Sequence, residues 1–183
     1  MQSRDDVNAA DVSTLVDAAR HGEGSAMDAL YRRFAPVVHG VLLGYVHDAD
    51  ADDLTQDVFE TALRRLDELR DAAAFPGWLL GIARHAALDA KRRRTPRTGV
   101  AIEAADPHAT HEERLDAQRS LAAIRDLPGA YRETLMLRLV EGLSGPEIAE
   151  RTGLSPGSVR VNLHRGMVLL RAALGTTTGA RVR

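Results

Sequence analysis

One dense group of residues that could bind a metal ion lies in the stretch HDADADDLTQDVFE, residues 47–60. The stretch contains six carboxylates and no basic residue, and its DxDxD start resembles the start of a calcium-binding loop. Such a loop needs glycine at its sixth position and glutamate at its twelfth. Counted from Asp48, these positions hold Asp53 and Phe59. The spacing therefore excludes a calcium loop, and we expect neither a metal ion nor another cofactor.

A helix gives these acidic residues another use. Leu54, Val58 and Ala62 are four residues apart, which predicts an amphipathic helix over residues 53–69. The residues 47–52 would then cap the helix, with Asp48, Asp50 or Asp52 as the capping side chain, and carboxylates near its start would oppose the helix dipole. The face opposite the apolar stripe carries what we call the acidic strip: Asp53, Gln56, Asp57 and Glu60.

Basic residues are concentrated in two other parts of the chain, although the net charge of the whole is only −2. Residues 1–74 hold 7 basic and 15 acidic residues, whereas 75–98 hold six basic and one acidic. Residues 99–128 are acidic again, and 129–183 hold eight basic and four acidic residues. Two basic regions joined by an acidic one predict two contacts with a polyanion.

The composition limits the class of protein. There is no cysteine, so disulfides and thiolate metal sites are excluded and a reducing compartment is expected. No apolar run reaches the length of a membrane span, and the polar, acidic N-terminus does not resemble a signal peptide. We therefore expect a cytoplasmic protein without membrane contact. Its 183 residues are enough for two small helical domains.

The spacing of apolar residues is helical almost everywhere, which predicts an all-α fold. Residues 95–111 lose this periodicity and contain two prolines, so they are predicted to be a linker. The predicted helices before the linker are 15–20 and 26–39, which Gly22 and Gly24 separate, then 53–69, and a fourth that starts near Pro76. The fourth helix ends in KRRR, and its predicted inward residues are Trp78, Leu79, Ile82, Ala83, Ala86 and Leu88. After the linker, one helix starts near Glu112 and another spans 131–140.

The C-terminal region has the pattern of a helix-turn-helix. Ser144 and Glu147 form a capping box, Gly153 suits the sharp turn, and Ser155 caps a second helix that starts with Pro156. We expect Leu154 and Val159 to close the core. No acidic residue follows Arg151, as a helix in the major groove of DNA requires. The alternative is a helical hairpin whose basic face is merely solvated. The predicted DNA-contacting residues are Ser155, Ser158, Arg160, Val161, His164 and Arg165.

Taken in order, these segments resemble a known family. DDLTQDVFETALRRL, FPGWLLGIARHAALDAKRRR, a linker without periodicity, and LPGAYRETLMLRLVEGLSGPEIAERTGLSPGSVRVNLHRG are similar to the extracytoplasmic-function sigma factors of the sigma-70 family. The resemblance implies two helical domains: region 2 over 1–94 and region 4 over 112–175, with the linker 95–111 between them and a tail over 176–183. It implies a non-enzymatic subunit that directs core RNA polymerase to promoters by their -10 and -35 elements and assists DNA melting.

The resemblance also assigns partners and residues. The acidic strip, Asp53, Gln56, Asp57 and Glu60, is expected to dock on the beta-prime clamp helices of core RNA polymerase. The beta subunit of the polymerase is expected to be a further contact. Promoter DNA and an anti-sigma factor are the other expected partners. The loop 69–75 is expected to capture a flipped base, with stacking on Phe75 or Trp78. The expected -10 residues are Trp78, Arg84, His85, Asp89, Lys91, Arg92 and Arg93.

The chain departs from the family pattern at two places, and two other functions fit parts of it. Pro76-Gly77 replaces longer polar residues, and Val161-Asn162 replaces a serine and an arginine, so the promoter sequence is not transferable. The alternative of a stand-alone helix-turn-helix repressor or activator would assign no function to the residues before Pro128. A metal-dependent hydrolase would use the aspartates with His47 or His85. The order of the motifs favours the sigma factor.

Overall fold

The computed structural model describes residues 11–93 and 110–179, with their side chains except those of 48, 114 and 176–179. All regular structure in these ranges is helical, which confirms the all-α prediction. The elements are α2 (Val12–Arg20), α3 (Gly24–Leu43), α4 (Asp48–Arg64), the 3-10 turns η1 (Leu66–Glu68) and η2 (Ala72–Ala74), α5 (Phe75–Arg93), α6 (His111–Arg125), α7 (Gly129–Leu139), α8 (Gly145–Thr152) and α9 (Pro156–Gly179).

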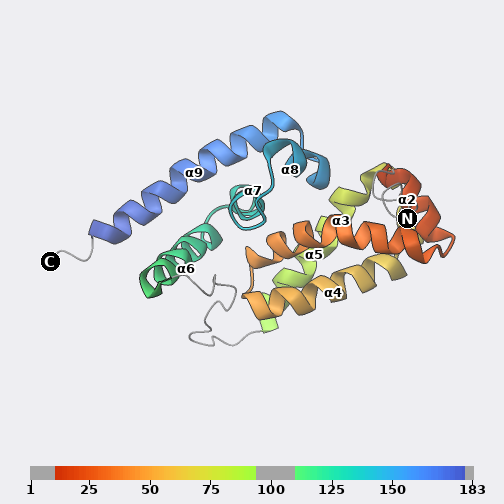
Figure 1. Cartoon of the computed structure of the whole chain (residues 1–183), viewed down its shortest axis with the longest axis horizontal. Coiled ribbons are helices and arrows are strands. Elements are labelled where there is room, and N and C mark those ends of the chain that lie inside the picture. The colour runs from red at the N-terminus through yellow and green to blue at the C-terminus, as the bar shows by residue number, and fades with distance from the viewer. Residues whose placement is uncertain (1–10, 94–109, 180–183) are drawn as a thin grey trace.

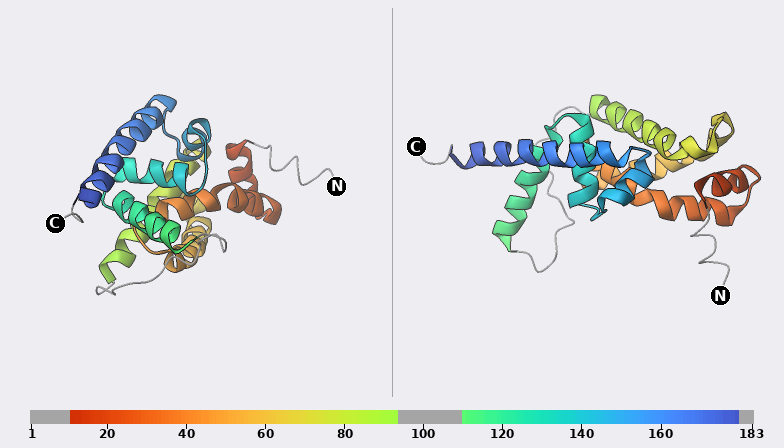
Figure 2. Two further views of the ribbon diagram at one scale, coloured as in Figure 1. Left: turned by 60° about the vertical axis from the view of Figure 1, so that its left-hand side comes forward. Right: turned by 90° about the horizontal axis from the view of Figure 1, so that it is seen from above.

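The helices form two groups that lie side by side. In Figures 1 and 2, α2 to α5 make one group and α6 to α9 the other, with α7 between α9 and α3. One cluster of buried apolar side chains runs through both groups. The predicted linker 95–111 lies outside the described residues, apart from Thr110 and His111. Within the described part of the chain, no helix has both the length and the apolar character of a membrane span.

The N-terminal helices are longer than their local sequence indicates. Gly24 starts α3 instead of separating two helices, and α3 continues through Pro36 to Leu43. Proline inside a helix removes one backbone hydrogen bond. Here the helix persists because residues on both sides of Pro36, among them Phe34 and Val37, are fully buried in the core. Tertiary packing thus outweighs the local cost of the proline.

The core of the N-terminal group is built around an aromatic contact. The rings of Phe34 and Phe75 meet edge to face with their centroids 5.4 Å apart. Leu79, Ala83 and most of the other predicted inward positions of α5 are buried or half-buried, but Leu88 is 40% exposed, so this prediction is wrong. Ala87 takes the buried position at that turn, because the apolar face of α5 follows a slightly different register.

The C-terminal group contains the predicted helix-turn-helix. Both hydrogen bonds of the capping box between Ser144 and Glu147 are present, and Gly153 ends α8 with a left-handed φ of 73°. Ser155 accepts a hydrogen bond from the Ser158 amide at 3.1 Å, which caps α9. Leu154 is 39% exposed in the turn, so it does not close the core as predicted. Val159, 1% exposed, fills that role.

We expect Ser144→Ala to lower the free energy of unfolding by about 1 kcal/mol at neutral pH, because the hydroxyl that accepts from the Glu147 amide and bonds to the Glu147 carboxylate is removed, while the backbone amide of residue 144 still donates to that carboxylate. The hydrogen bonds from Ser144 hold the pKa of the Glu147 carboxyl below its usual range. The stabilising form is therefore the carboxylate, and its contribution is lost as the pH falls through that lowered pKa.

The measurement is urea unfolding of both proteins across the acid range. The difference between wild type and Ser144→Ala should be largest at neutral pH and should shrink in acid. Ser120→Ala in the interior of α6 is the control, because its hydroxyl bonds only to the Asp116 carbonyl of its own helix. Equal stability of Ser144→Ala and wild type at pH 7 would contradict the prediction.

Candidate nucleic-acid interface

The acidic strip has the predicted geometry. All four residues are exposed on α4, and Val58 and Ala62 on the opposite face are each 1% exposed. The predicted cap is wrong, however: α4 starts at Asp48, and its N-cap is His47, which makes no side-chain capping bond. Asp50 and Asp52 therefore lie inside the first turns, where their charges still oppose the helix dipole. The described residues contain no cluster of three or more metal-binding side chains.

A groove of about 670 Å³ runs between α4 and α5. Its apolar lining includes Leu54 and Val58 from α4 and Ile82 from α5. It brings two predicted sites together, because Asp57 of the acidic strip shares it with residues predicted to contact the -10 element. The members of that second set in the groove are Trp78, His85, Asp89 and Arg93.

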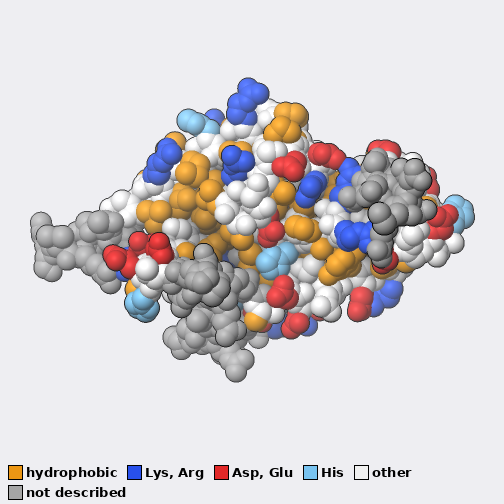
Figure 3. Space-filling view, in the orientation of Figure 1, with side chains coloured by type: hydrophobic (Ala, Val, Ile, Leu, Met, Phe, Trp, Pro, Cys, Tyr) orange, Lys and Arg blue, Asp and Glu red, His pale blue; other side chains and the backbone are white. Residues whose placement is uncertain are grey.

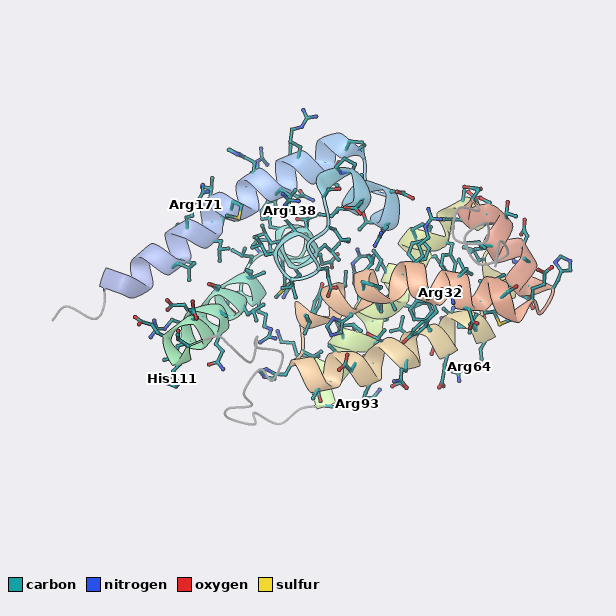
Figure 4. The ribbon with its side chains drawn as sticks, in the orientation of Figure 1. Arg32, Arg64, Arg93, His111, Arg138 and Arg171 are labelled. Atoms are coloured by element: carbon teal, nitrogen blue, oxygen red, sulfur yellow. The ribbon has the colours of Figure 1, made fainter. Side chains whose placement is uncertain are left out.

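The other predicted -10 residues point elsewhere. Lys91 and Arg92 are exposed near the end of α5, where Arg92 pairs with Asp89 at 3.2 Å. Arg93, which lines the groove, lies at the C-terminal end of α5 in Figure 4, beside the start of α4. Arg84 is half-buried and turns away from the groove, toward α7. The predicted set is therefore divided between two faces of α5.

The two aromatic candidates for base stacking differ in accessibility. Phe75 is 2% exposed and packs on Phe34, so in this conformation it cannot stack on a base. Trp78 is half-buried, lies 6.1 Å from the Phe75 ring between centroids, and lines the groove. In the loop 69–75, Leu69 is also buried. Of the two aromatics, only Trp78 is open to solvent.

The predicted -35 residues share one surface of α9 and the turn before it. All six are exposed, and for Val161 the exposed fraction is 45%. The Ser155 and Ser158 hydroxyl oxygens are 2.9 Å apart. Figure 3 shows Lys and Arg side chains along the edge formed by α9, and Arg171 projects from this helix in Figure 4. This face therefore presents hydrogen-bond donors and the apolar side chain of Val161, and none of its six predicted residues carries a carboxylate.

Glu133 on α7 is a site that the sequence did not indicate. Its carboxylate accepts two hydrogen bonds from the Arg84 guanidinium, at 2.8 and 2.7 Å, and one from the Tyr45 hydroxyl at 3.0 Å. The Glu133 side chain is 11% exposed. These hydrogen bonds raise the pKa of Arg84, and burial together with the Glu133 charge raises the pKa of Tyr45. In the sequence, the one sign of this site is that the acidic Glu133 directly precedes residues 134–137, which the structure shows to be buried.

Comparisons with known proteins agree with this arrangement. Residues 30–97 match the family Sigma-70 region 2, and residues 118–170 match Sigma-70, region 4. The chain is 35% identical to RNA polymerase sigma factor CarQ of Myxococcus xanthus, over 85% of this chain and 93% of CarQ. It is 32% identical to the ECF RNA polymerase sigma-E factor of Escherichia coli, over 82% of this chain and 87% of that protein.

Solved structures give the same result. CnrH, determined in complex with the cytosolic domain of CnrY, is 25% identical with a TM-score of 0.60, covering 90% of this chain and 97% of that one. RpoE of Bartonella quintana, in complex with the anti-sigma factor NepR, shares the fold at 20% identity and a TM-score of 0.54, covering 81% and 96%. The chain therefore belongs to the extracytoplasmic-function RNA polymerase sigma factors of the sigma-70 family.

Proposed function

We propose that the face of α9 that carries Ser158, Arg160, Val161, His164 and Arg165 reads the -35 element in the major groove. The observation that carries this proposal is that the face is exposed and free of carboxylates at the start of a helix that the Ser155 hydroxyl caps. Arg160 and Arg165 supply forked donors for phosphates or guanine, and Val161 supplies an apolar contact for a thymine methyl group.

The -10 element is assigned to α5. Arg92 and Arg93 at its end hold DNA phosphates, which positions the duplex without reading its sequence. Trp78 and His85 in the groove are placed to meet bases once the strands separate, because an accessible aromatic ring can stack on any unpaired base. The half-buried ring of Trp78 packs against the core and also lines the groove, so part of it is accessible for this role.

Core RNA polymerase is assigned to the acidic strip on α4. Four polar side chains, three of them charged, stand on one exposed face whose reverse is locked into the core. A basic helical surface such as the beta-prime clamp helices is complementary to this charge. The beta subunit is a further contact. This assignment favours a sigma factor over a stand-alone helix-turn-helix protein, in which the strip would have no partner.

An anti-sigma factor is the third proposed partner, after promoter DNA and core RNA polymerase. Two of the similar solved structures are complexes, of CnrH with the cytosolic domain of CnrY and of RpoE with the anti-sigma factor NepR. In this chain, the groove between α4 and α5 offers an apolar floor next to the acidic strip. A regulator seated there would cover the polymerase-binding surface, and both proteins would act in the cytoplasm.

The experiment that tests the function as a whole is transcription with purified core RNA polymerase. The protein is added to core enzyme and a library of promoter fragments, and transcript starts are mapped. A sigma factor produces defined starts that core enzyme alone does not. A stand-alone repressor or activator instead binds duplex DNA without polymerase and produces no new start.

We expect Asp53→Arg and Asp57→Arg each to weaken binding to core RNA polymerase at least tenfold, because like charges placed in the contact repel the partner. Binding is measured by fluorescence anisotropy with labelled protein. Asp28→Arg, an equally exposed change on α3, is the control and should bind as wild type does. The melting temperatures should stay unchanged, and full-strength binding by both strip variants would rule out this docking surface.

We expect the double variant Arg92→Ala with Arg93→Ala to weaken the binding of holoenzyme to all promoters to a similar degree. Its plot of log affinity against log salt should be flatter by about one unit for each phosphate that the variant no longer neutralises. Filter binding at several salt concentrations measures both quantities. A change of promoter preference at unchanged overall affinity would instead show that these side chains read bases.

A further inference from the structure

Among the described residues, the hydrogen bonds to the Glu133 carboxylate all come from the other group of helices. Its described hydrogen-bond partners are Arg84 on α5 and Tyr45 after α3, whereas Glu133 itself belongs to α7. A carboxylate with this little exposure is costly to bury unless donors surround it. Glu133 is therefore adapted to a state in which the two groups of helices are docked, and would gain full hydration if they separated.

The surrounding contacts are polar and also cross between the groups. Arg132 stacks over the Tyr45 ring, 4.2 Å from the centroid, and Arg125 donates a hydrogen bond to the Leu43 carbonyl at 2.9 Å. At the edges of the contact, Arg33 pairs with Glu150 and His39 lies 3.0 Å from a Glu141 oxygen. These polar contacts lie beside the apolar cluster that runs through both groups, and polar contacts of this kind are frequent where two parts of a chain move relative to each other.

Two glycines four residues apart, at the end of α3 and just after it, allow the close approach. A Cβ atom on Gly40 would lie 2.8 Å from Cγ of Glu141 and 3.0 Å from Cδ2 of Leu137. One on Gly44 would lie 3.0 Å from Cγ of Arg132. The helix therefore has no room for side chains at the positions where the C-terminal group meets it.

We propose that Glu133 is an intramolecular latch that holds the free protein closed by occupying Arg84 in place of a DNA phosphate. This inference rests on the proposed function, in which Arg84 belongs to the helix that meets the -10 region. A carboxylate and a phosphate both offer paired oxygens to the guanidinium fork, so they compete for it. DNA binding through Arg84 therefore requires α7 to leave α5, and closure suppresses DNA binding by the free protein.

Opening is measured as a distance within the protein, without DNA or polymerase. The chain has no cysteine, so the exposed positions Asp28 and Leu154, one in each group, can be changed to cysteine and spin-labelled uniquely. In that background, Glu133→Gln should lower the closed-to-open ratio by about tenfold or more, because the amide keeps one acceptor oxygen but loses the charge that strengthens the hydrogen bonds from Arg84. Pulsed electron-electron double resonance should then show a longer, broader distance.

Asp116→Asn is the matched control. It also turns an acid into its amide and breaks an ion pair, with Arg119 at 3.0 Å, but within α6 on the exposed surface. Its distance distribution should match that of the unsubstituted labelled protein. The latch is excluded if Glu133→Gln also matches it, or if the protein with native Glu133 already shows the broad, open distribution.

Two further variants keep the test decisive if Glu133→Gln loses stability. Tyr45→Phe removes only the hydroxyl that bonds to Glu133, and should open the protein in the same direction but less. Gly40→Leu adds a side chain where α7 approaches and should also open it. If the groups do not dock there, Gly40→Leu leaves the distance unchanged and raises the melting temperature, because leucine favours helix more than glycine does.

The consequence for DNA is measured with the free protein and a fluorescent single-stranded oligonucleotide. Glu133→Gln should bind it several-fold more tightly than wild type, and Asp116→Asn should not. An opened Glu133→Gln with unchanged affinity would overturn the competition between Glu133 and phosphate. Failure of the sigma-factor function would appear separately, as absence of defined transcripts with core polymerase, and would leave the distance result intact.

Discussion

The arrangement of the two helix groups depends on burying the Glu133 carboxylate. A charge with so little access to water is tolerated only when donors are fixed around it, and here they come from α5 and from the end of α3. The donors must therefore keep α3, α5 and α7 at defined separations, and the lack of a side chain at Gly40 and Gly44 makes those separations possible. The Glu133 carboxylate thus adds a polar requirement to the apolar core that the two groups share.

Local signals in the sequence were enough for most of the fold. The capping box at Ser144, the left-handed turn at Gly153 and the stripe of Val58 on α4 depend on residues only a few positions apart. The predictions failed where packing decides. Leu154 and Leu88 match an apolar period yet lie outside the core, and α3 passes through Pro36 because its flanking residues are buried. The periodicity of apolar residues therefore predicts which face of a helix is buried, but not where the buried part of that face ends.

The candidate site was predictable in part for the same reason. The acidic strip and the exposed face of α9 each lie on one helix, so helical spacing alone places their members together. The pairing of Glu133 with Arg84 joins residues 49 positions apart, and no local pattern encodes it. The groove shared by Asp57 and His85 likewise exists only once α4 and α5 are packed. Sequence reasoning located the surfaces but not the contact that relates them.

Acidic and basic residues are concentrated in different parts of the chain. The acidic strip on α4 and the basic face of α9 belong to different groups of helices, whereas in the groove between α4 and α5 the strip residue Asp57 lies with Arg93. Arg84 and Glu133 also bring opposite charges together. Arg84 lies on α5 and Glu133 on α7, so the two belong to different groups of helices, and their side chains pair with each other. In the docked state, Arg84 is thus paired with the other group of helices, while Lys91, Arg92 and Arg93 at the end of α5 stay exposed, with Arg92 paired to Asp89 of the same helix.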